Sequence, residues 1–154
     1  MIKFLGMPTD QARQLQLEGR DAYDRPVETK INESKSSPCR HCLQNIPVQQ
    51  KMIVCAYRPF SGLHAYAETG PIFLCSNSCK AFKGPNIPSI FADSPDFLMK
   101  SYNTKERIIY GSGSIVPSDS IEQRAAALLD DTNAAFVDIR SARNNCWLAR
   151  AVRR

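Results

Sequence analysis

Two cysteine pairs carry the spacing that is most typical of a metal site. Cys39 and Cys42 form a C-x2-C pair, and Cys75 and Cys79 form a C-x3-C pair. A tight turn can direct two thiolates at one ion, and Zn²⁺ prefers four soft or borderline ligands in a tetrahedron. The spacing therefore predicts a zinc site with these four cysteines as its ligands. Because four protein thiolates leave no position for water or substrate, we expect a structural role with no catalysis at the metal.

The chain between the two pairs is long enough to bring them together. The 32 residues 43–74 have room for two strands that fold back and place the second pair beside the first. We expect a short helix to begin near Cys79, so that the order is knuckle, hairpin and helix, as in a treble-clef zinc finger. Residues 38–83 are therefore a candidate zinc-binding subregion.

Two other interpretations of the same cysteines remain open. The four thiols could be unpaired core residues without a metal. The first pair also matches the C-x2-C motif of thiol–disulfide oxidoreductases, in which the first cysteine opens a helix that lowers its pKa. Pro47 follows too closely here for a long helix, which disfavours redox catalysis.

The remaining cysteines and the histidines have no partners set by spacing. Cys55 lies in an apolar run and Cys146 precedes Trp147, so we expect both to be small core residues. His41 stands between two predicted ligands, and we expect it to face solvent. We expect His64 to be a surface or hydrogen-bonded histidine.

A second candidate site is a polar turn near the C-terminus. Arg140, Arg143, Asn144 and Asn145 lie between two apolar segments. Together with Arg58 they offer guanidinium forks and amides that could hold a carboxylate or phosphate. This set indicates an alternative function, a small-anion binder or an enzyme that uses an Arg/Asn cleft. The competing interpretation is a hairpin turn made by the asparagines, with solvated arginines.

Composition and charge favour a folded globular chain. The 154 residues are 43% hydrophobic and 23% charged, which excludes a mainly disordered chain and a fibre. The net charge is +5, and five arginines lie in the last fifteen residues. A weak nucleic-acid binder is therefore a third alternative, although this charge is too small to indicate one by itself. The partner could equally be a small anion or another protein.

The sequence predicts a cytoplasmic protein. No apolar run approaches the ~20 residues needed to span a bilayer, so we expect no membrane segment. The first apolar run ends at Pro8, short of the ~7–15 apolar residues of a signal peptide. Six cysteines are too few for a disulfide scaffold of this length, and in a reducing compartment spaced cysteines are more often metal ligands.

The pattern of apolar residues predicts an α+β fold with a largely antiparallel sheet and two to three helices. We expect one helix from Thr9 or Asp10 to before Gly19, and another from Ser118 or Asp119 through Leu129. Strands are expected at residues 2–5, 27–31, 51–60, 71–75, 97–102, 107–110, 134–139 and 146–152. Residues 1–154 then form a single domain in which the cysteine subregion is a zinc-finger-like insertion of the treble-clef type.

Several segments also resemble a known family. They are residues 1–5 with Pro8, 38–43, Tyr66 with 70–74, and 135–146. These segments are similar to the bacterial "domain of unknown function" family 1203, and the chain is identified as a member of a subgroup with a treble-clef-like cysteine pattern. The resemblance implies a small, soluble, single-domain bacterial protein. It implies no established activity, substrate or catalytic residue.

Overall fold

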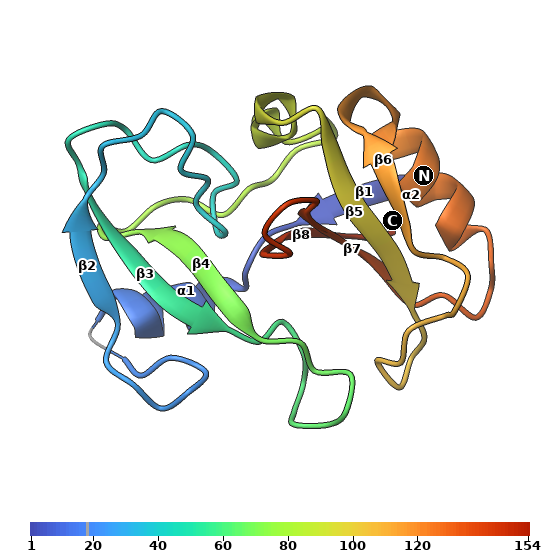
Figure 1. Ribbon diagram of the computed structural model, residues 1–154, viewed down its shortest axis with the longest axis horizontal. Helices are drawn as coiled ribbons and strands as arrows, with labels where there is room; N and C mark the ends of the chain where they lie inside the picture. The colour runs from blue at the N-terminus through green and yellow to red at the C-terminus, as the bar shows by residue number, and fades with distance from the viewer. Residues whose placement is uncertain (18) are drawn as a thin grey trace.

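The computed structural model describes residues 1–17 and 19–154 and consists of two lobes that lie side by side (Figure 1). One lobe contains a five-stranded sheet in the order β1-β8-β7-β5-β6, and the other a three-stranded sheet in the order β2-β3-β4. All pairings between neighbouring strands are antiparallel. The expected α+β class with antiparallel sheets is confirmed.

The five-stranded sheet carries the larger core. Its strands are β1 (Ile2–Leu5), β5 (Asp96–Tyr102), β6 (Ser114–Pro117), β7 (Phe136–Ser141) and β8 (Trp147–Arg153). Helix α2 (Ile121–Leu129) packs on this sheet through four buried side chains, those of Ile121, Ala125, Leu128 and Leu129. Their spacing places them on one face of the helix, as the sequence predicts. Two 3-10 turns, η1 (Ser89–Asp93) and η2 (Ser118–Ser120), flank the sheet.

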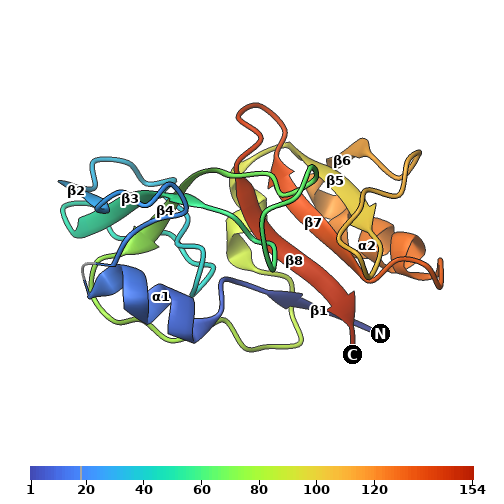
Figure 2. The same ribbon diagram turned by 90° about the horizontal axis from the view of Figure 1, so that it is seen from below.

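The two ends of the chain meet in this sheet. Strand β1 pairs with the last strand, β8, with Ile2 opposite Arg153. The backbone N–H of Arg154 donates to the carbonyl of Met1 at 3.1 Å. The N- and C-termini accordingly lie close together in both views (Figures 1 and 2). The first strand thus fastens the N-terminus to the larger lobe before the chain crosses to the smaller one.

The three-stranded sheet and the first helix form the smaller lobe. Its strands are β2 (Glu28–Ile31), β3 (Lys51–Tyr57) and β4 (Gly70–Cys75), and α1 (Thr9–Gln16) packs against them. Ala12 and Leu15 of α1 share a buried cluster with Met52, Ile53 and other apolar residues of the sheet. This lobe therefore has its own core, and the cysteine pairs are at its boundary with the larger lobe.

Two local expectations were wrong, and one strand was not expected. Residues 79–82 form no helix, so the helix of a treble clef is missing after the second cysteine pair. Residues 107–110 form no strand, because the Asn103 side chain accepts the backbone N–H groups of Lys105 and Arg107 and fixes a turn there. Strand β6 was not expected from the sequence, since Ser114 and Pro117 leave it only two apolar residues in a row.

Candidate metal centre

The first cysteine pair lies on a tight knuckle at the junction of the two lobes. The backbone N–H of Cys39 donates to the carbonyl of Gln44 at 2.9 Å, and that of Leu43 donates to the carbonyl of Cys39 at 2.9 Å. Leu43 has a positive φ of 53°, which closes the turn. Its side chain is fully buried in the core of the larger lobe, whereas Cys39 packs into the core of the smaller lobe. The knuckle is therefore held by both cores.

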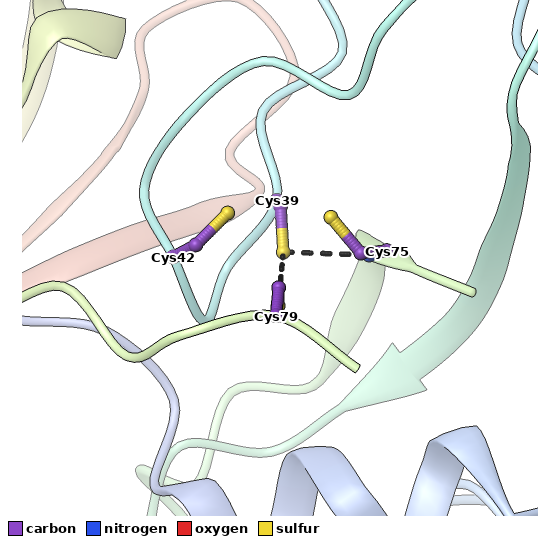
Figure 3. A group of neighbouring side chains, drawn as sticks. All are labelled: Cys39, Cys42, Cys75 and Cys79. Atoms are coloured by element: carbon purple, nitrogen blue, oxygen red, sulfur yellow. Dashed lines mark hydrogen bonds between the residues drawn. The ribbon is translucent and has the colours of Figure 1, made fainter. Parts of the chain in front are cut away.

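Strand β4 delivers the second pair to the knuckle. Cys39 forms a parallel bridge with Phe73, and the backbone N–H of Arg40 donates to the carbonyl of Phe73 at 3.1 Å. Cys75 is the last residue of β4, and Cys79 lies on the irregular segment that follows. Figure 3 shows the four cysteine side chains converging from these two stretches of chain.

The four sulfur atoms have a spacing suited to one ion. The Sγ atoms of Cys39, Cys42, Cys75 and Cys79 all lie within 4.8 Å of one another. The Sγ atoms of Cys39 and Cys79 are 3.9 Å apart. All six cysteines of the chain have free thiols, so no disulfide competes for these sulfurs. The arrangement can hold a metal ion with four thiolate ligands.

Hydrogen bonds to sulfur surround the cluster. The backbone N–H of Cys75 donates to Sγ of Cys39 at 3.3 Å. Nδ1 of His41 lies 3.1 Å from Sγ of Cys79, and its Nε2 lies 2.9 Å from the hydroxyl oxygen of Thr9. A thiolate can only accept, so with Cys79 ionised the imidazole donates through Nδ1 and accepts the Thr9 hydroxyl at Nε2. The expectation that His41 faces solvent was wrong, because the residue is fully buried.

Helix α1 holds the second pair in place through side chains that the sequence did not single out. Nε2 of Gln16 donates to the carbonyls of Cys75 and Asn77, each at 2.9 Å. Nη2 of Arg13 donates to the carbonyl of Cys79 at 2.6 Å. These contacts span about sixty residues of sequence, so no local pattern could have indicated them.

The closeness of the thiols changes their acidity. Hydrogen bonds from the Cys42 and Cys75 thiols lower the pKa of Cys39 to about 6. Hydrogen bonds from its three neighbours also lower the pKa of Cys79. Hydrogen bonds to Cys39 and Cys79 raise the pKa of Cys42 and Cys75 well above the usual range, and further negative charges in the cluster would also repel one another. A bound cation relieves this repulsion and allows all four thiols to ionise.

The predicted anion-binding arginines contact carboxylates of this chain. Nη2 of Arg140 lies 3.0 Å from the Glu68 carboxylate, and Nη1 donates to the carbonyl of Asn145 at 3.1 Å. Arg143 pairs with Asp96 at 2.8 Å on the surface. Asn145 has a positive φ of 59°, as the hairpin interpretation expects.

The other two members of that set line separate cavities. Arg58 lines a cavity that also contains Glu106 and Arg150. Asn144 lines a cleft between the lobes, and its backbone N–H donates to the Ser141 hydroxyl. The predicted anion-binding arginines and asparagines therefore lie in different places in the structure. A shared role in binding an anion stays a prediction.

The arginines near the C-terminus are engaged inside the molecule. Arg150 pairs with buried Asp138 at 2.7 Å and lies over the Phe136 ring at 3.5 Å. Arg153 donates to the carbonyls of Ala134 and Asp131, each at 2.7 Å. These contacts favour structural roles for both side chains, and nucleic-acid binding stays a prediction.

Nothing in the sequence indicates the position of Arg40, which is almost fully buried between the first two cysteines. Burial lowers the pKa of Arg40 to about 10, while the nearby thiols of Cys146, Cys39 and Cys55 oppose that shift. The guanidinium therefore remains charged at neutral pH. The usual preference of arginine for the surface gives no signal that could have indicated this burial.

Comparison with known proteins finds a family that the chain matches. A model of the family described as "Protein of unknown function (DUF1203)" matches residues 36–154, which include all four clustered cysteines. No curated protein and no solved structure matches the chain. Among the described residues, no helix is both long enough and apolar enough to cross a membrane.

Proposed function

We propose that this chain, which belongs to the DUF1203 family of proteins of unknown function, is a zinc-binding structural module with a closed four-cysteine site. The ligands are Cys39, Cys42, Cys75 and Cys79. The observation that carries the proposal is the mutual distance of their sulfur atoms, all within 4.8 Å.

The geometry of the sulfurs supports zinc as the ion. Zn–S bonds of ~2.3 Å in a tetrahedron separate neighbouring sulfurs by ~3.8 Å. Cys39 and Cys79 are 3.9 Å apart, close to that value. A set of four thiolates in a tetrahedron is typical of zinc or of iron–sulfur chemistry, and oxygen-preferring ions such as Mg²⁺ and Ca²⁺ are excluded by the donor type.

The surroundings of the sulfurs support a structural role. A closed site has no open coordination position, so the ion contributes folding energy rather than catalysis. Here it would tie the knuckle, which both cores hold, to the end of β4 in the smaller lobe. We expect the zinc to fix the orientation of the lobes within a single domain of residues 1–154, and the resulting surface to serve a protein partner.

The free thiols support a reducing compartment, and a cytoplasmic location is part of the proposal. Four neighbouring thiols in an oxidising compartment would be converted to disulfides in competition with the metal.

Elemental analysis of the purified protein tests the proposal. We expect about one zinc per chain, released when the thiols are blocked with a mercurial reagent. Cys75→Ser should lose the metal, because it removes one of four ligands. Cys146→Ser is the matched control, since this cysteine lies outside the cluster, and it should keep one zinc per chain. A wild-type protein prepared without chelators that contains no metal contradicts the proposal.

A further inference from the structure

A cleft of about 520 Å³ lies between the lobes. In Figure 1 the β7–β8 turn lies to the right of β4 and below the η1 segment, and residues of these three parts line the cleft. Its volume falls within the ~300–1,000 Å³ of small-molecule sites. The metal centre does not use this cleft, although Arg40 of the knuckle forms part of its wall.

Arg40 brings a buried positive charge to the cleft. The residue is only 4% exposed. Its Nε donates to the carbonyl of Trp147 at 2.7 Å, and its Nη1 donates to the carbonyl of Pro38 at 2.6 Å. Among residues 1–17 and 19–154, no carboxylate forms an ion pair with Arg40. No group of these residues accepts a hydrogen bond from its Nη2.

A buried guanidinium needs an acceptor for each of its N–H groups, because a charged donor that is left unsatisfied is costly. Backbone carbonyls accept hydrogen bonds from Nε and Nη1 of Arg40, whereas Nη2 has no acceptor among the described residues. The backbone of Arg40 is also fixed, because its N–H donates to Phe73 and its carbonyl accepts the N–H of Met7. The guanidinium is therefore preorganised, with Nη2 as its free donor.

The other residues that line the cleft are both apolar and polar, which restricts the class of ligand that the cleft can bind. Apolar side chains form most of it, namely Pro38, Pro71, Ile72, Phe73, Ile90, Phe97 and Leu148. Asn144, Ser141, Ser36, Ser94 and Cys146 add uncharged polar groups. Asp93 is the single carboxylate of the lining; it is exposed, and Nδ2 of Asn45 donates to it at 2.6 Å.

We propose that this cleft binds a small organic carboxylate with a hydrocarbon body, whose head group accepts a charge-assisted hydrogen bond from Nη2 of Arg40. The hydrocarbon body lies against Phe73, Phe97 and Leu148. An inorganic anion would leave this apolar wall without contacts, and a neutral hydrocarbon would leave Nη2 of Arg40 without an acceptor. The site requires both parts of the ligand.

Cys146 provides a reporter inside the cleft. It lines the cavity and is partly exposed, whereas Cys55 is buried and the other four cysteines form the metal cluster. Alkylation by N-ethylmaleimide can be followed at this residue by peptide mass spectrometry, so reaction elsewhere in the chain does not affect the measurement. A ligand seated in the cleft should shield the thiol.

The experiment compares octanoate with octanamide, which has the same hydrocarbon body and no charge. Calorimetry gives the Kd of octanoate for the wild-type protein. At ten times that Kd, octanoate should slow alkylation of Cys146 about tenfold, because about one cleft in eleven is then free. Octanamide at the same concentration should slow it less than about twofold. Equal protection by both compounds, or protection by neither, overturns the proposal.

Substitution of Arg40 tests whether this residue contacts the carboxylate head group. Arg40→Gln should weaken octanoate binding at least about tenfold, the loss expected for a hydrogen bond between two charged groups. Arg154→Gln is the control, because it removes one positive charge at an exposed position outside the cleft lining, and its Kd should match the wild type. Unchanged binding by a folded Arg40→Gln protein overturns the assignment.

A further variant guards against misfolding of Arg40→Gln. Asn144→Trp places a large side chain from an exposed turn over the cleft and leaves the Arg40 contacts intact. It should also abolish protection of Cys146 by octanoate, and full protection in this variant contradicts the location. Zinc content is measured in every preparation, so that failure of the cleft and failure of the metal site are told apart.

Discussion

Replacing Glu68 with glutamine should weaken the contact between the two lobes and lower the free energy of unfolding. Glu68 lies on the loop between β3 and β4 in the smaller lobe and reaches three side chains of the larger sheet. Its carboxylate pairs with Lys100, accepts a hydrogen bond from the Tyr102 hydroxyl at 2.6 Å, and lies 3.0 Å from Nη2 of Arg140. Glu68→Gln keeps the size of the side chain and removes its charge, which leaves two cations beside a neutral amide.

The expected loss in the free energy of unfolding depends on how exposed these groups are to water. Removing one partner of a fully buried ion pair costs about 3–5 kcal/mol, because the other charge remains buried. Arg140 is 4% exposed, but Glu68 is 25% exposed, so water compensates part of the loss. We therefore expect the free energy of unfolding to fall by about 2–3 kcal/mol. With a urea slope of roughly 2 kcal/mol/M, the midpoint should fall by roughly 1 M.

Urea unfolding followed by fluorescence of the single, buried Trp147 measures this change. Arg143→Gln is the matched control, since its pair with Asp96 is exposed and should contribute about 0–1 kcal/mol. A loss below about 0.5 kcal/mol for Glu68→Gln would refute the reasoning, because the pair would then contribute no more than a surface one.

The effect should depend on pH. Burial raises the pKa of Glu68, but hydrogen bonds from Lys100 and Tyr102 and the charge of Arg140 outweigh it, so the pKa lies below its ordinary value of 4.5. A lowered pKa in the folded state means that the stabilisation is complete above pH 4.5 and is lost as the pH falls through the folded pKa. The difference in stability between wild type and Glu68→Gln should therefore shrink below pH 4.5, and a constant difference would contradict this assignment.

Two further substitutions have defined outcomes. His41→Ala removes the hydrogen bond to Cys79 and should speed zinc loss to a chelator about 10–100-fold, as expected for a residue that orients a metal ligand, and an unchanged rate would exclude that role. Arg153→Gln removes the donor to the carbonyls that follow α2 and should lower the free energy of unfolding in urea by about 1 kcal/mol. Arg154→Gln should have no measurable effect, and equal losses in both variants would contradict the contact.

Elements with a strong local pattern were predicted from the sequence. The apolar face of α2 appears as Ile121, Ala125, Leu128 and Leu129 at helical spacing, and the structure has the helix at Ile121–Leu129. Strands β1, β2, β3, β4, β5, β7 and β8 fall within a few residues of the expected ranges. The errors concern short segments, where turns and prolines compete with weak apolar patterns.

The clustering of the cysteines was also predicted, because paired spacing is a local property of a knuckle and of a strand end. The groups around them were not. His41 was expected in solvent, since nothing in the sequence shows that Thr9 of α1 lies on its other side. Arg13 and Gln16 reach the second pair only because α1 packs on the smaller sheet.

The sequence by itself therefore determined the α+β class, the family and the four thiols that converge, because each depends on residue types at short spacing. Only the tertiary structure decided the division into two lobes, the contact of Glu68 with Arg140, and the cleft that contains Arg40 and Cys146. These features join residues up to about a hundred positions apart. Their energies arise from burial and from the exclusion of water, which depend on the packed neighbours of a side chain and not on its sequence neighbours.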